Sequence, residues 1–118
     1  DVFYHLHISK DSVEFNIETE LVGKQNFEVL DTMLERYNKK VAVMSIGTSG
    51  EMKMLTSNIS VKDPGGKLRS HGRGGLGAVM GSKKIKVITS NGFLTSNWIA
   101  FWVAHNSGFT NLVIYWLV

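Results

Sequence analysis

Five glycines fall within ten residues, between Gly72 and Gly81, and no other feature limits the fold of this chain as strongly. Glycine loses more backbone freedom on folding than any other residue, so a dense run disfavours a long helix or a long strand. It also lets a backbone approach a ligand closely, because no Cβ intervenes. We therefore expect a loop that leads into a short helix near residues 75–81.

Positive charge gathers at the same place. Residues 62–86 contain seven lysines and arginines and one acid, whereas residues 1–61 contain nine acids and six bases. Residues 87–118 contain no charged side chain, and the formal net charge of the whole chain is only +3. This uneven distribution favours a local anionic ligand and argues against a general nucleic-acid-binding surface.

Phosphate groups require close backbone approach, exposed N–H donors and positive charge. The first two requirements are met by Gly72, Gly74, Gly75 and Gly77, and the third by Arg69 and Arg73. The pattern therefore predicts a phosphate-binding loop, and the residues alone leave open a glycine-rich turn with no ligand.

Two common nucleotide motifs do not fit this loop. It lacks the Gly-Lys-Ser/Thr ending of a Walker A loop. The letters GRGGLG match G-x-G-x-x-G, but a dinucleotide site also needs a preceding strand, a long helix and an acid about 20 residues further on. The Asp63–Gly66 turn lies upstream and no acid follows Asp63, so a dinucleotide site is disfavoured.

Hydrophobic periodicity predicts an α+β fold with a mostly antiparallel sheet. Apolar residues alternate with polar ones over Val2–Ile8 and Val13–Ile17, as in a hairpin. We expect Asn26 to cap one amphipathic helix over residues 27–38. The apolar face of this helix holds Phe27, Leu30, Met33, Leu34 and Tyr37.

The middle of the chain reads as strands joined by turns. Val41–Ile46 is a short apolar run typical of a buried strand, followed by a tight loop over Gly47–Gly50. We expect residues 52–61 to be extended, residues 63–66 to form a turn and residues 84–89 to form another strand.

Residues 90–118 form an uncharged, apolar tail. Its two apolar runs of seven residues are too short to span a bilayer, which takes about 20. The tail either forms two strands, over Ile99–Ala104 and Leu112–Leu117, or is non-native sequence.

The chain has no cysteine and no signal peptide, so we expect a cytoplasmic protein without membrane attachment. The first residue is Asp1 and not methionine, which predicts a piece of a longer chain.

Isolated titratable residues give weaker signals. His5 and His7 share one strand face but lack a third ligand, which favours surface histidines over a metal site. His71, inside the glycine-rich segment, would add charge near a phosphate at low pH. Glu51 has no partner acid, so a loop or capping role is favoured over catalysis.

Two segments resemble the aldehyde ferredoxin oxidoreductase family. Arg69–Lys86, RSHGRGGLGAVMGSKKIK, is similar to the family signature R-x-x-(G/A)-R-G-G-(L/V)-G-A-V-M-G-S-K-x-(L/I)-K. Val43–Glu51, VMSIGTSGE, resembles the family's strand and I-G-x-x-G-E loop. The resemblance covers about residues 3–89 and implies a partial cofactor-binding N-terminal domain, half of a two-sheet β saddle. The tail, residues 90–118, departs from it.

The resemblance implies an enzyme that oxidises aldehydes to carboxylic acids with ferredoxin as electron acceptor. Its cofactors would be a tungsten (or molybdenum) bis-pterin with magnesium and a [4Fe–4S] cluster. Residue by residue, it implies phosphate contacts from Arg69, Gly72, Arg73, Gly74 and Gly75, with Gly77 in the same loop. It also implies a main-chain carbonyl contact to magnesium at Ser70, where the family usually has alanine.

The resemblance also implies what this chain does not contain. The family's first sheet, the cluster cysteines and the acid/base residues would lie in missing N-terminal and helical domains, so the chain alone would be inactive, and no catalytic residue is assigned. The alternative is a stand-alone, non-catalytic anion- or nucleotide-binding module, or the remnant of a decayed gene. A homo-oligomer is left open.

Overall fold

Nine helices and strands follow one another along residues 2–9, 11–62 and 66–91, which are the residues that the computed structural model describes. In chain order they are β1 (Phe3–Ile8), β2 (Val13–Glu18), α1 (Asn26–Arg36), β3 (Ala42–Ser45), α2 (Thr48–Glu51), β4 (Ile59–Lys62), β5 (Leu68–His71), α3 (Leu76–Ser82) and β6 (Ile85–Ser90).

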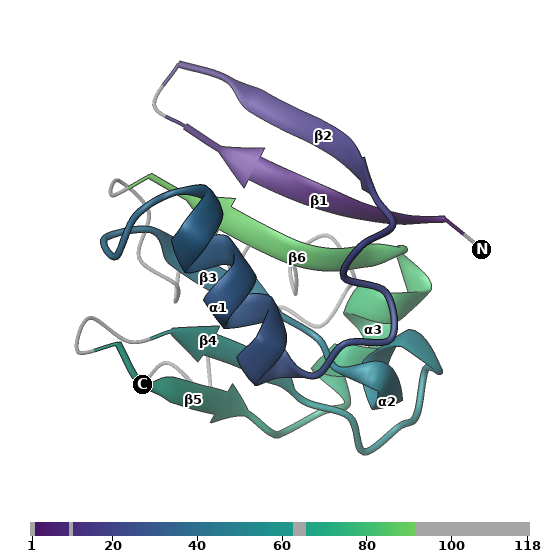
Figure 1. The fold of residues 1–118 in the computed structure, drawn as a ribbon. Coiled ribbons are helices and arrows are strands. Elements are labelled where there is room, and N and C mark those ends of the chain that lie inside the picture. Colours follow the sequence, from purple (N-terminus) through teal and green to yellow (C-terminus); the bar gives the residue numbers. More distant parts are fainter. Residues whose placement is uncertain (1, 10, 63–65, 92–118) are drawn as a thin grey trace.

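All six strands join one sheet, in the order β2-β1-β6-β3-β4-β5. The pair β1 and β6 is parallel and the other four pairs are antiparallel. Strands β1 and β6 lie side by side although they come from the two ends of the described chain (Figure 1). The predicted α+β fold with a mostly antiparallel sheet is confirmed.

The sheet buries apolar side chains on both faces. Helix α1 lies across one face (Figure 1), and its core there is formed by Leu21, Val29, Leu30, Met33, Val41, Val43 and Val87. A second core, which includes residues of α3, holds Phe3, Leu6, Met44, Ile46, Ile59, Val61, Leu76, Met80, Ile85 and Ile88. Successive strand residues such as Val87 and Ile88 enter different cores because side chains alternate across a strand.

Helix α1 confirms the predicted amphipathic helix, but the expected cap was wrong by one residue. The N-cap is Gln25, whose backbone N–H donates to the Glu28 carboxylate at 2.8 Å. Asn26 is the first helical residue, and its Oδ1 accepts a hydrogen bond from Ser45 Oγ at 2.9 Å. The contact with Ser45 therefore explains the asparagine better than capping does.

Other local expectations were corrected as well. Residues Thr48–Glu51 form one helical turn, α2, instead of a tight loop. Of residues 52–61, only the end is extended, where β4 begins at Ile59. Strand β5 was not expected. Helix α3 confirms the short helix predicted near residues 75–81, and β6 confirms the strand predicted over residues 84–89. Most of the turn expected over 63–66, and the strands expected over 99–104 and 112–117, lie outside the described residues.

Candidate functional site

The predicted phosphate-binding residues lie at one edge of the sheet, where β5 leads into α3. Arg69 and Ser70 belong to the edge strand β5 and pair with Val61 and Ser60 of β4. Both are exposed. The four residues that follow β5, Gly72 to Gly75, are called the glycine loop below. The structure thus divides the predicted loop into an exposed strand end, a turn and a helix.

The middle of the glycine loop has a backbone conformation that requires glycine. Gly74 has φ of 77° and Gly75 has φ of 63°, in the left-handed region that L side chains rarely adopt. Gly75 is the N-cap of α3, and a Cβ placed on it would lie 2.6 Å from Leu55 O. These two residues turn the chain sharply between β5 and α3.

Gly77 and Gly72 differ in what surrounds them. A Cβ on Gly77 would lie 2.5 Å from Asn58 O, and its N–H donates to Ser57 O at 3.2 Å. Gly77 is buried, so close packing within the chain already accounts for this glycine. At Gly72, by contrast, a Cβ would meet nothing within 4 Å. The open side of the loop is therefore at Gly72.

Positive charge borders the exposed part of this edge. Lys67, Arg69 and Arg73 are exposed. His71, which lies between the two arginines in sequence, is buried. Burial lowers the pKa of His71 to about 4. His71 would therefore add positive charge near a phosphate only below about pH 4, and at neutral pH the positive charge comes from the arginines.

Glu51, the last residue of α2, lies in a buried ion pair. Its Oε1 is 2.5 Å from Nζ of Lys86, and both of its carboxylate oxygens accept from the backbone N–H of Gly23, at 3.0 and 3.1 Å. Sequence reasoning missed Lys86, because lysine is rarely fully buried. The loop or capping role favoured for Glu51 stays a prediction.

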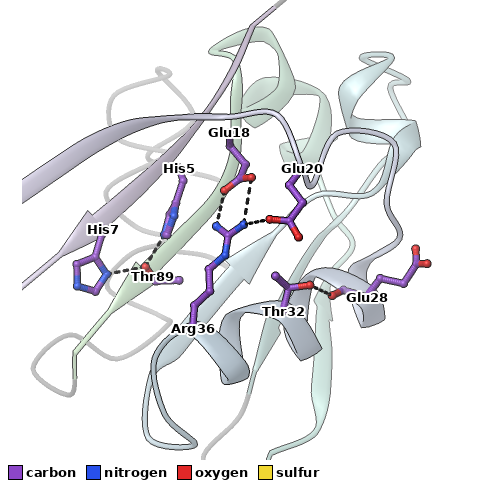
Figure 2. A network of polar contacts seen from close by, with 8 residues as sticks. All are labelled: His5, His7, Glu18, Glu20, Glu28, Thr32, Arg36 and Thr89. Carbon is purple, nitrogen blue, oxygen red and sulfur yellow. Dashed lines mark hydrogen bonds and ion pairs between the residues drawn. The ribbon is translucent and has the colours of Figure 1, made fainter.

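A second polar cluster lies between the sheet and α1. Figure 2 shows His5 and His7 directed at Thr89, and Arg36 held between Glu18 and Glu20. The Thr89 Oγ1 atom is 2.7 Å from Nε2 of His5 and 2.7 Å from Nδ1 of His7. Both histidines are buried, so the surface position expected for them was wrong.

This second cluster serves packing and charge balance. Arg36 donates from Nη1 to Glu18 Oε2 at 2.7 Å and from Nη2 to Glu20 Oε2 at 2.5 Å. Burial is the main cause that lowers the pKa of His5 to about 4, against an opposing effect of Glu18. Among residues 2–9, 11–62 and 66–91, no group of three or more histidine, aspartate and glutamate side chains is placed to hold a metal ion.

Within residues 2–9, 11–62 and 66–91, no helix is both long enough and apolar enough to cross a bilayer.

Comparison with known proteins links the chain to one family. The family model described as "Aldehyde ferredoxin oxidoreductase, N-terminal domain" matches residues 2–92. A tungsten-containing aldehyde ferredoxin oxidoreductase of Pyrococcus abyssi is 37% identical over 89 residues, which are 75% of this chain and 14% of that protein. An aliphatic sulfonate oxidoreductase, WOR-like subunit, of Pyrococcus furiosus is 30% identical over 101 residues, covering 75% of this chain and 16% of that protein.

A solved structure shares the fold. The active site complex BamBC of benzoyl coenzyme A reductase, in complex with 1,5-dienoyl-CoA, matches with a TM-score of 0.65 and 29% identity. The match covers 79% of this chain and 14% of that one, so the chain spans about a seventh of the length of these proteins. The family model and the related sequences show that the chain belongs to the aldehyde ferredoxin oxidoreductase family, and it matches part of that family's N-terminal region.

Proposed function

We propose that this chain forms one wall of the cofactor site of a tungsten (or molybdenum) bis-pterin oxidoreductase, and that the wall binds the cofactor's phosphates. The whole enzyme would oxidise aldehydes to carboxylic acids and pass the electrons to ferredoxin. The observation that carries the proposal is the edge formed by β5 and the glycine loop. There, the exposed Arg69 and Arg73 lie on either side of the exposed Gly72 in sequence, and the chain turns at Gly74 and Gly75.

The range of relatives supports a role in holding the cofactor over one in choosing the substrate. Their names refer to an aldehyde, an aliphatic sulfonate and benzoyl coenzyme A, although each is similar to this chain over the same region. A domain kept across such different substrates is best explained by a ligand that the enzymes have in common.

Each residue of the edge has a distinct part in this proposal. The Arg69 and Arg73 guanidinium groups donate charge-assisted hydrogen bonds to phosphate oxygens. The backbone at Gly72 admits a phosphate closely, because no Cβ would face it there. Ser70 lies on the edge strand β5, and its main-chain carbonyl would contact the magnesium ion of the cofactor.

The sequence has no cysteine to hold an iron–sulfur cluster, and the described residues hold no group of three metal-binding side chains. When bound, the metal bis-pterin supplies the two-electron oxidation chemistry. Under this proposal, the [4Fe–4S] cluster and the ferredoxin contact belong to the remaining six sevenths of an enzyme of the relatives' length.

Calorimetric titration with magnesium pyrophosphate tests the phosphate site directly. We expect Arg69→Ala and Arg73→Ala each to weaken binding about tenfold or more, because each removes a charge-assisted hydrogen bond. Lys40→Ala is the matched control, since Lys40 is exposed and precedes β3 at the end of the sheet opposite the glycine loop. Unchanged affinity in both arginine variants would refute the proposed site.

A hybrid protein tests the connection to tungsten. Residues 2–92 of this chain would replace the matching segment of the Pyrococcus abyssi relative, and metal content would be measured after growth with tungstate. We expect the hybrid to retain tungsten and its Arg69→Ala/Arg73→Ala form to retain much less. A hybrid without tungsten, combined with tight pyrophosphate binding by the chain, would instead support a stand-alone anion-binding module.

A further inference from the structure

Lys86 is a fully buried lysine that no step of the proposed phosphate site uses. Its side chain has 0% exposure. Its Nζ lies 2.5 Å from Glu51 Oε1 and donates to Lys24 O at 2.9 Å. Burial lowers the pKa of Lys86, and the neighbouring Glu51 carboxylate opposes that shift. A lone buried charge is costly, so Lys86 depends on Glu51 as its ionic partner.

Glu51 joins three parts of the chain that are far apart in sequence. It is the last residue of α2, it accepts the Gly23 N–H of the β2–α1 loop, and it pairs with Lys86 of β6. The position of α2 is therefore tied at once to the centre of the sheet and to the segment that leads into α1.

Helix α2 in turn fixes the position of α3, because the two backbones touch. A Cβ placed on Gly81 would lie 1.9 Å from Gly50 O, and one on Gly50 would lie 3.1 Å from Gly77 O. With no side chain between them, the two helices cannot shift independently toward or past one another. Figure 1 shows α2 and α3 next to each other at one end of the sheet.

The segment that follows α2 also contacts the end of the glycine loop. A Cβ placed on Gly75 would lie 2.6 Å from Leu55 O, and Ser57 O accepts the Gly77 N–H. Both contacts that hold the beginning of α3 thus come from residues next to α2 in the chain. A displacement of α2 would move both α3 and this support.

We propose that Glu51 and Lys86 are positioning residues for the phosphate site: their ion pair holds α2, and through α2 it sets the conformation of the glycine loop. This inference rests on the proposed function of that loop. It adds that residues with no contact to the ligand determine its affinity.

The first test compares Glu51→Gln with Glu18→Gln. Each variant removes a largely buried carboxylate from an ion pair, but Glu18 pairs with the partly exposed Arg36 at β2, on the opposite edge of the sheet from β5. We expect Glu51→Gln to weaken magnesium pyrophosphate binding about tenfold and Glu18→Gln to leave the affinity unchanged, although both lower the melting temperature. Equal affinities in the two variants would overturn the positioning role.

A double variant separates positioning from stability. Glu51→Gln/Lys86→Met removes both charges of the pair, so we expect much of the lost stability to return. The link from α2 to β6 stays absent, and the affinity should remain near that of Glu51→Gln. If affinity recovers together with the melting temperature, the pair serves stability only and the inference is wrong. The same variant answers the question if Glu51→Gln alone does not fold.

Amide hydrogen exchange without any ligand keeps this inference distinct from the proposed function. We expect faster exchange at residues 75–80 in Glu51→Gln than in Glu18→Gln, because local opening of α3 becomes easier. Equal rates in the two variants would count against the pair. Failure of the unaltered chain to bind pyrophosphate would refute the phosphate site alone, and the exchange comparison would still decide the role of the pair.

Discussion

At the scale of single residues, buried titratable groups make the stability of this chain depend on pH. His5 is buried beside Thr89, and its pKa falls to about 4, chiefly through burial. Between that value and the ordinary 6.5, the unfolded chain binds a proton that the folded chain does not. The stabilisation is therefore complete above pH 6.5 and decreases as the pH falls toward 4.

We expect the free energy of unfolding, measured by urea denaturation, to fall by about 2 kcal/mol per such histidine between pH 7.5 and pH 4.5. His5→Gln keeps a polar group beside Thr89 but does not titrate, so its unfolding free energy should depend less on pH. His71→Gln should behave in the same way, since the pKa of His71 is also about 4. Identical pH profiles for His5→Gln and the unaltered chain would refute the assignment.

These residues also mark a limit of sequence reasoning. Local patterns carry no information about partners such as Glu51 and Lys86, which lie 35 positions apart in sequence. The same holds for His5 and Thr89, separated by 84 positions. The arginines and glycines of the proposed phosphate site form a recognisable pattern because they are neighbours in sequence. The Glu51–Lys86 pair was missed because its two residues are far apart in sequence.

At the scale of elements, periodicity identified the β1–β2 hairpin, α1 and β6 but missed β5. Leu68–His71 contains one aliphatic side chain and no β-branched residue, so nothing local favours a strand there. Its extended form comes from pairing with β4, which is a tertiary effect. The single turn of α2 was missed for a similar reason, because its glycine serves contact with α3.

The contact between α2 and α3 predicts opposite outcomes for two glycine substitutions. Gly81→Ala would place a Cβ 1.9 Å from Gly50 O, so we expect a loss of about 3 kcal/mol or a failure to fold. Gly72→Ala meets nothing within 4 Å and should change the unfolding free energy by less than about 0.5 kcal/mol. Thermal and chemical denaturation check both values. Similar losses in the two variants would contradict the close approach of the helices.

At the scale of the whole molecule, one face of the edge strand β2 is apolar and exposed. Val13, Phe15 and Ile17 alternate along it and are 64%, 56% and 66% exposed. Within the described part of the chain, the one aromatic ring stacked on this face is that of Tyr4, whose centroid lies 4.6 Å from that of Phe15. An exposed apolar edge strand promotes association with other chains.

We expect Val13→Thr/Ile17→Thr to raise the concentration at which the purified chain stays monomeric, because both changes keep the β-branched shape and add a hydroxyl. Analytical ultracentrifugation and light scattering measure this effect. Leu55→Thr is the control, since Leu55 is 86% exposed but lies outside the strands. If Leu55→Thr improves solubility as much, general surface hydrophobicity and not the edge strand causes the association.

The place of β6 in the sheet has a consequence for how the chain acquires its structure during synthesis. This strand is the last of the described ones to leave the ribosome, yet it lies between β1 and β3 and connects the hairpin to the other strands. Until about residue 90 has emerged, β1 lacks one neighbour and β3 lacks another. The nascent chain therefore holds two separate groups of strands, and a single late event joins them.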